Sequence, residues 1–472
     1  MIATTIHAIM FSRKFKIRKI LNMKISIPGA KYKLSWIFIL MYFLPSFIFV
    51  FFKQSSLAVG IAIVSILIIL FDILQITNRK IGVKGLILFV LVIMLLLIES
   101  FHSVYSFNDS KPIMSIPVVI LMIIAAWSLS FRIENSDEIV VKDSFKFALC
   151  VFLFFGWLAV FRTIDIGNYA SKGKGAFPFS EDSHYALCAG FLSCIVGSTS
   201  SFKGKLFILL NISAQAILFP NLTLLVFSLI CCFLFWFSNR FLLLAVLICV
   251  VAVSGTLILQ SMQGTFAGDY LLSRMDLSKN SNNLTTLVFL QGIDDSIRAL
   301  TDTYGIGLGF QRAGTDTLGE YGYLIKVLTG GEYNRTDGGF LSSKIITEFG
   351  VMGLMASLLY TLLILRSVTN YRQSDSQTVR QSDSQTVRQS DSQTVRQSDS
   401  QTVRQSDSQT VRQSDSQTVR QSDSQYIIKI SSAAMIAFSV EFFLRGYGYF
   451  SPSVILLIAL TLCSIRIKKN RA

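Results

Sequence analysis

The chain has 472 residues, of which 52% are hydrophobic and only 15% are charged, and its formal net charge is +15. The apolar residues form long uninterrupted blocks, a pattern that excludes a soluble globular core. The basic residues gather at the ends of these blocks, so membrane orientation explains the positive charge better than a nucleic-acid partner does. All seven cysteines lie inside apolar blocks without a C-x-x-C pair, which argues against disulfides and zinc sites.

The N-terminal segment, residues 1–33, is basic and leads directly into a full-length apolar block. It lacks the short apolar core and the small-residue cleavage site of a removable signal peptide. We therefore expect it to remain attached to the protein, on the cytoplasmic side.

The apolar blocks are long enough to cross the roughly 30 Å of hydrocarbon in a bilayer as helices. They predict an all-α integral membrane protein with about twelve transmembrane helices. The weakest predictions are the seventh and eighth helices, because only Phe219, Pro220 and Asn221 separate them. The predicted spans are 34–52, 55–76, 85–100, 112–131, 144–161, 183–200, 205–219, 222–238, 241–260, 342–365, 427–444 and 451–465.

The short loops on the two sides of the predicted membrane differ in charge. One side collects most of the Lys and Arg residues, including the tail 466–472, whereas the other carries only Lys53, Lys111 and Arg445. The positive-inside rule places the basic side, with both termini, in the cytoplasm. Two long loops, 162–182 and 261–341, then face outward.

The loop 261–341 is long enough to carry structure of its own. LTTLVFLQGIDDSIRALTDTY and GEYGYLIKVL have the spacing of amphipathic helices, which we expect to lie on the membrane. A structureless loop of this length would be unusual, so the sequence predicts a small subdomain that covers the membrane helices.

The loop 366–426 contains six copies of RQSDSQTV followed by a partial copy. Each copy offers a single Val, which is too little apolar surface to fold. We interpret the array as a disordered cytoplasmic linker that expanded by replication slippage. A docking array for a partner protein is the alternative.

The segment PFSEDSHYAL opens the sixth predicted span on the outer side. With Ser180 as the helix N-cap, Glu181 and His184 would share a face of the first turn. The free amides of a helix start attract an anionic oxygen, and His184 could donate a hydrogen bond or act as a base. An ordinary cap with an interfacial histidine is the alternative.

The segment NRTDGGFLSSKIITEFGVMGL leads from the large loop into the tenth predicted span. Asp337 precedes two glycines that allow a tight turn. Glu348 follows within an apolar helix, where a carboxylate is expected to face a wet cavity or a partner. For Gly350 and Gly353 we expect close helix packing.

Further cations lie on the outer side of the predicted membrane. In EFFLRGYGYFSP, Glu441 and Arg445 are four residues apart, so they could form a simple ion pair, or Glu441 could orient Arg445 toward a phosphate. Arg298 and Arg312 lie in the large loop. The same loop holds GIGLGF, which lacks the context of a dinucleotide site and predicts turns, and Asp294-Asp295, which is a weak candidate for a metal site.

Taken in chain order, FSEDSHYAL, LVFLQGIDDSIRAL with GIGLGF, DGGFLSSKIITEFGVMGL and EFFLRGYGYFSP resemble the O-antigen and capsular polysaccharide polymerases of the Wzy type. The resemblance covers roughly residues 150–460, without the repeats. The sequence has Asp182 where the family's E-P-S-H form has proline.

The resemblance implies a GT-C-like fold in the bacterial inner membrane. It also implies transfer of a growing glycan from undecaprenyl pyrophosphate to a hydroxyl of the next lipid-linked repeat unit at the periplasmic face. A chain-length-regulating membrane protein is a candidate partner. The expected catalytic residues are Glu181, His184, Asp337 and Glu348, and the expected substrate-binding residues are Arg298, Arg312, Arg445 and Glu441. Because pyrophosphate leaves readily once cations neutralise it, this chemistry requires neither a metal nor a nucleotide cofactor.

Two other functions fit part of the pattern. An O-antigen ligase has a similar architecture, but ligases of that family carry a functional histidine in the large outer loop, and the three histidines here are His7, His102 and His184. A transporter or flippase of lipid-linked oligosaccharide would be expected to show internal repeats of its spans and cations deep within them.

Overall fold

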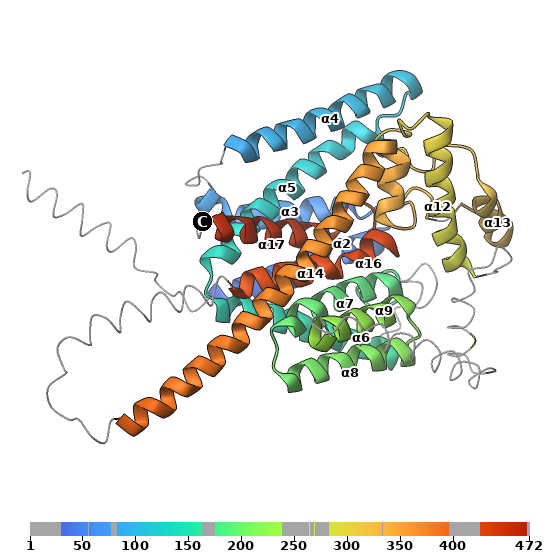
Figure 1. The fold of residues 1–472 in the computed structure, drawn as a ribbon. Coiled ribbons are helices and arrows are strands. Elements are labelled where there is room, and N and C mark those ends of the chain that lie inside the picture. Colours follow the sequence, from blue (N-terminus) through green and yellow to red (C-terminus); the bar gives the residue numbers. More distant parts are fainter. Residues whose placement is uncertain are drawn as a thin grey trace, which may run out of the picture.

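A computed structural model describes residues 30–54, 56–76, 83–162, 175–237, 264, 269, 283–332, 334–395 and 425–469. Within these residues every regular element is a helix, which confirms the all-α prediction (Figure 1). The first helices of the bundle are α2 (Ala30–Phe51), α3 (Ala58–Ile76), α4 (Val83–Phe107), α5 (Lys111–Asn135) and α6 (Glu138–Val160). They are followed by α7 (Asp182–Ser198), α8 (Phe202–Leu218) and α9 (Leu222–Cys232), which continues as a π-helical turn, Phe233–Phe237.

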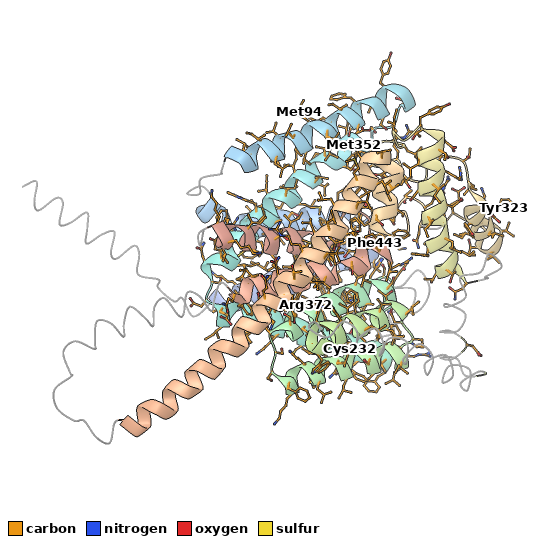
Figure 2. The ribbon with its side chains drawn as sticks, viewed as in Figure 1. Met94, Cys232, Tyr323, Met352, Arg372 and Phe443 are labelled. Carbon is orange, nitrogen blue, oxygen red and sulfur yellow. The ribbon has the colours of Figure 1, made fainter. Side chains whose placement is uncertain are left out.

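Each predicted span that falls within the described residues coincides with a helix, and 241–260 lies outside them. In the described residues, five helices are long and apolar enough to cross a membrane, and their apolar stretches are Lys33–Phe51, Gly85–Tyr105, Lys111–Asn135, Leu341–Ser374 and Gln425–Phe443. Many large apolar side chains on these helices are exposed, among them Met94 of α4 (51%) and Met352 of α14 (Leu341–Val395; 57%), labelled in Figure 2. Such a surface suits a hydrocarbon environment, in which only internally hydrogen-bonded backbone is stable.

The core of the bundle is continuous, with α3 packed on α2 and α5, α5 on α17 (Pro452–Lys469), and α7 on α6 and α9. Phe38 of α2 stacks on Phe145 of α6 with ring centroids 4.2 Å apart. Burial of a charged group is costly unless the group is paired, and α3 provides an example. Asp72 of α3, which is 2% exposed, accepts hydrogen bonds from Ser128 Oγ at 2.8 Å and Arg132 Nε at 2.7 Å.

Two helices form a subdomain at one end of the bundle, which we call the α12 end (Figure 1). They are α12 (Leu284–Asp302) and α13 (Glu320–Thr329), and they confirm the two amphipathic helices predicted in the large loop. Leu287 and Val288 of α12 pack against Ile325 of α13. The opposite face of α12 packs on α14, where Ser296 Oγ donates to the carbonyl of Ser343 at 3.1 Å.

The longest helix, α14 (Leu341–Val395), is broken at Gly350, whose backbone angles are φ 56° and ψ −127°. The turns of GIGLGF lie against this break, as Val351 N donates to the carbonyl of Gly305 at 2.8 Å and Gly309 N donates to that of Glu348 at 2.8 Å. The loop and the helix are so close that a Cβ on Gly350 would lie 2.0 Å from Gly305 O. The GIGLGF loop therefore packs against α14 at the break.

Beyond its apolar part, α14 continues as a helix through Val395 and so includes the first copies of the octapeptide repeat, from Arg372. This differs from the predicted structureless linker. A helix that has already formed extends at little cost, because only nucleation is unfavourable, and Arg and Gln are good helix formers. Residues 396–424 lie outside the described part of the chain.

Candidate functional site

A cavity of about 910 Å³ lies at the α12 end of the bundle. One part of its wall is charged and polar, and another part is apolar. The charged and polar wall comes from five separate segments of the chain and includes Asp109, Lys111, Ser180, Glu181, His184, Gln311, Asp337, Lys344, Arg445, Tyr447 and Tyr449.

Four helices begin at this cavity. Ala58 and Lys111, the first residues of α3 and α5, line it directly, as do the residues at the starts of α7 and α14. The free N–H groups of a helix start carry a partial positive charge of about half an elementary charge. The convergence of four helix starts therefore favours an anionic ligand in the cavity before any side chain is considered.

Arg445 brings a permanent positive charge into the wall and pairs with Glu181. Its Nη2 lies 2.8 Å from Glu181 Oε2, and the same oxygen accepts a hydrogen bond from Ser183 Oγ at 3.2 Å. Both side chains are largely buried, with exposures of 12% and 17%. The pair joins segments that are far apart in the sequence.

The expected pairing of Arg445 with Glu441 is absent. The helix that carries Glu441, α16 (Ser439–Phe443), ends before Arg445, and the chain then turns toward α7. The Glu441 carboxylate lies instead beside the hydroxyls of Ser451 and Ser453 and does not line the cavity. The prediction treated EFFLRG as one continuous helix. It therefore gave Arg445 the wrong partner, because the chain turns before that residue.

His184 lies in the first turn of α7 and faces the cavity. Its Nδ1 is 3.1 Å from Ser180 Oγ, and its ring lies 4.2 Å from that of Tyr447, centroid to centroid. Tyr447 also donates a hydrogen bond from its hydroxyl to the backbone carbonyl of His184 at 2.7 Å. Ser180 is not the helix cap that the sequence predicted, because α7 begins one residue later with Glu181 as its N-cap and the serine hydroxyl faces the imidazole.

Asp337 lies in the tight turn that precedes α14, where Gly338 and Gly339 have φ angles of 69° and 72°, as the two glycines predicted. Its side chain is open to the cavity. The protein around the cavity shields Asp337 from bulk water and so raises its pKa, and the positive charges of Lys344, Lys111 and Arg445 partly offset this rise. A carboxylate with a raised pKa is a better proton acceptor at neutral pH than an ordinary aspartate.

Glu348 is engaged on both carboxylate oxygens. It accepts hydrogen bonds from the backbone N–H groups of Gln311 at 2.9 Å and Ala313 at 3.2 Å, and from the Tyr449 hydroxyl at 2.7 Å. Lys344 Nζ lies 3.4 Å away. Glu348 is fully buried and does not line the cavity, so it holds the loop after GIGLGF and the Tyr449 segment against α14.

Arg298 and Arg312, expected in the substrate site, do not line the cavity. Arg298 donates to Asp316 Oδ2 at 3.3 Å and to the carbonyl of Thr317 at 2.8 Å, within the α12 subdomain. Arg312 is 8% exposed and donates to Thr315 Oγ1 at 3.4 Å. Both arginines therefore have structural contacts that spacing in the sequence did not reveal.

Two cations of the cavity, Lys111 and Lys344, were missed among the expected site residues. Lys111 stood out only as one of the few basic residues in the predicted outer loops. Lys344 lies four residues before Glu348, a spacing that places both on one face of α14. In the described residues no group of three or more His, Cys, Asp or Glu side chains could hold a metal ion, and Asp294-Asp295 forms no such group.

The cavity can thus hold an anion between Arg445, Lys111 and Lys344, with Glu181, His184 and Asp337 as neighbouring proton acceptors. No family model, no curated protein and no solved structure matched the chain.

Proposed function

We propose that the protein is a membrane-embedded polymerase that joins lipid-linked sugar repeat units into a surface polysaccharide. The observation that carries the proposal is the cavity, whose wall combines Arg445, Lys111, Lys344 and four helix starts with apolar side chains. A ligand that fits both parts has an anionic head and a hydrocarbon chain. The undecaprenyl pyrophosphate donor implied by the resemblance to Wzy-type polymerases is such a ligand.

In the proposed reaction, the bond between the anomeric carbon of the growing glycan and the pyrophosphate oxygen breaks. A new bond forms from that carbon to a hydroxyl oxygen of the next lipid-linked repeat unit. The hydroxyl proton passes to a base, for which Asp337, Glu181 and His184 are placed in the cavity wall. The bond electrons remain on the pyrophosphate, whose growing charge Arg445, Lys111 and Lys344 stabilise.

The proposal includes the arrangement in the cell. About twelve helices span the bacterial inner membrane in a GT-C-like fold, both termini are cytoplasmic, and the α12 end faces the periplasm. The alternation of basic and non-basic loops supports this orientation. Lipid-linked glycans on the periplasmic leaflet could then reach the cavity without crossing the bilayer.

The test is the purified protein supplied with a lipid-linked repeat unit, followed by separation of the products by size. We expect a ladder of oligomers. Arg445→Lys should reduce the rate at least about tenfold, because lysine cannot keep the planar contact with Glu181 while it binds a phosphate. Arg298→Lys is the matched control and should remain within about twofold of the native rate, because Arg298 is bound to Asp316 and Thr317 outside the cavity.

A fully active Arg445→Lys protein would remove this residue from the site, and the absence of any ladder would reject the polymerase. In the cell, loss of an O-antigen polymerase should leave the lipid A core capped by single repeat units. Complete loss of capping would indicate a ligase or a flippase instead.

A further inference from the structure

The apolar wall of the cavity comes mainly from the starts of two helices. Val59, Ala62 and Ile63 of α3 and Met114 and Val118 of α5 line it. The residues of this wall do not belong to the buried core, because Val59 is 45% exposed, Ile63 38% and Met114 72%. An open apolar wall beside a charged one is costly in water and needs an apolar ligand or lipid to cover it.

The exposed face of α3 continues beyond the cavity. Val59 and Ile63 are followed at helical spacing by Ile66 (43% exposed) and Leu70 (56% exposed). These residues form a single apolar stripe that extends along the helix for about 16 Å, at 1.5 Å per residue. The other face of α3 is closed, since Ile61, Val64 and Ile68 are at most 2% exposed.

The stripe gives the cavity a sideways continuation on the outside of the bundle. A ligand whose head lies among the cations could place its chain along α3 without passing through the protein core. A lipid that diffuses in the plane of a bilayer could enter by the same path, because Met114 and Val59 leave that side of the cavity open.

We propose that the stripe formed by Val59, Ile63, Ile66 and Leu70, together with Met114, binds the hydrocarbon chain of a long-chain prenyl diphosphate and guides it sideways into the cavity. The choice of a prenyl diphosphate over another anionic lipid rests on the proposed function. Three cations and four helix starts line the cavity together with the carboxylates of Asp109, Glu181 and Asp337, so a diphosphate head would lie against the cations and the helix starts.

The experiment measures equilibrium binding of three probes to the purified native chain in detergent. The probes are a long-chain prenyl diphosphate, inorganic pyrophosphate and an anionic phospholipid. Val59→Trp and Met114→Trp change exposed positions, so both proteins should fold. Leu91→Trp, at a position 61% exposed on α4 and away from the cavity wall, is the matched control.

We expect Val59→Trp and Met114→Trp to weaken binding of the prenyl diphosphate at least about tenfold, because the larger side chains obstruct the path of the hydrocarbon chain, while inorganic pyrophosphate binds as it does to the native chain. Leu91→Trp should bind the prenyl diphosphate and inorganic pyrophosphate as the native chain does. Unchanged binding of the prenyl diphosphate by both cavity variants would overturn the proposal. An equal loss of pyrophosphate binding would also overturn it, because the substitutions would then act on the site of the diphosphate head and not on the hydrocarbon chain. Equal affinity for the anionic phospholipid, with the same dependence on Val59, would overturn the assignment to a prenyl diphosphate. If binding depends on the hydrocarbon chain of the lipid but the purified protein forms no product ladder, this inference stands and only the polymerase function is rejected.

Discussion

Lys344 is the residue at which the cavity meets the buried network behind it. Its side chain lines the cavity, donates to the carbonyl of Thr336 and lies 3.4 Å from Glu348 and 5.2 Å from the centre of the Tyr449 ring. It therefore has two roles, as part of the positive charge available to a ligand and as the neutralising partner of a fully buried carboxylate.

These two roles can be separated by mutation. Lys344→Met should destabilise the protein by about 3–5 kcal/mol, because it leaves the buried charge of Glu348 without its cation. Lys344→Met combined with Glu348→Gln should recover most of that stability, yet turnover should remain impaired because the cavity still lacks a cation. Thermal unfolding and product formation, measured on both variants, check this. Recovery of turnover by the double variant would show that Lys344 serves only the buried network.

Asp295 of α12 gives a prediction about pH. Burial and the neighbouring carboxylate of Asp316 raise its pKa to about 7, although Arg335 and Arg298 act in the opposite direction. The folded protein therefore binds this proton more tightly than the unfolded chain does. Stability should fall as pH rises from about 4 to about 7, by up to about 1.4 kcal/mol per unit.

Asp295→Asn removes the ionisation and should raise the unfolding temperature relative to the native protein at pH 8 more than at pH 5. Thermal unfolding in detergent at the two pH values measures this. Asp302→Asn, which changes an exposed carboxylate at the end of the same helix, should leave the difference between the two pH values unaltered. A native protein with equal stability at both pH values would contradict the prediction.

The residues of the site could be predicted only in part. Glu181, His184, Asp337 and Arg445 lie at helix starts or in glycine-rich turns, where the sequence pattern is local and readable, and the structure brings all four to one cavity. The partners of Arg298 and Glu348, and the pairing of Arg445 with Glu181, depend on contacts between distant segments. Spacing along the chain contains no information on such contacts.

At the level of elements, the break in α14 makes the sharpest prediction. Gly350 has a positive φ, and any Cβ there would meet the backbone of the GIGLGF loop. Gly350→Ala should therefore destabilise the protein by more than about 2 kcal/mol, from both the strained backbone and the clash. Gly85→Ala, in α4 with nothing within 4 Å of the added Cβ, is the control and should stabilise slightly, by about 0.5–1 kcal/mol. Thermal unfolding compares the two, and equal stability of the two variants would mean that the break is not required.

The helices themselves were predictable because long apolar blocks leave the backbone no alternative to internal hydrogen bonds in a membrane. The break was not. The sequence predicted close packing at Gly350, and the close neighbour is the carbonyl of Gly305, but glycine inside an apolar helix does not reveal whether the helix bends. The continuation of α14 into the polar repeats was missed for a related reason, since composition indicates what a segment can bury and not whether a helix upstream will extend into it.

For the whole molecule, the proposed orientation predicts opposite labelling at the two ends of the bundle. Tyr304, which is 96% exposed at the α12 end, should react as Tyr304→Cys with a membrane-impermeant maleimide in cells whose outer membrane has been permeabilised. Lys203→Cys, in the first turn of α8 at the opposite end, should react only after the inner membrane is disrupted. Labelling in the reverse order would place the cavity in the cytosol and reject the proposed function.

The polar part of α14 projects past the bundle at the end opposite α12 (Figure 1). Where the octapeptide is helical, gain or loss of one copy shifts everything that follows by eight residues, which is about 12 Å along the helix axis. The same change turns the direction of the side chains by about 80° beyond two full turns, at 3.6 residues per turn. Slippage in the gene would therefore alter the reach and the angular phase of this arm together, in fixed increments, and leave the packed bundle untouched.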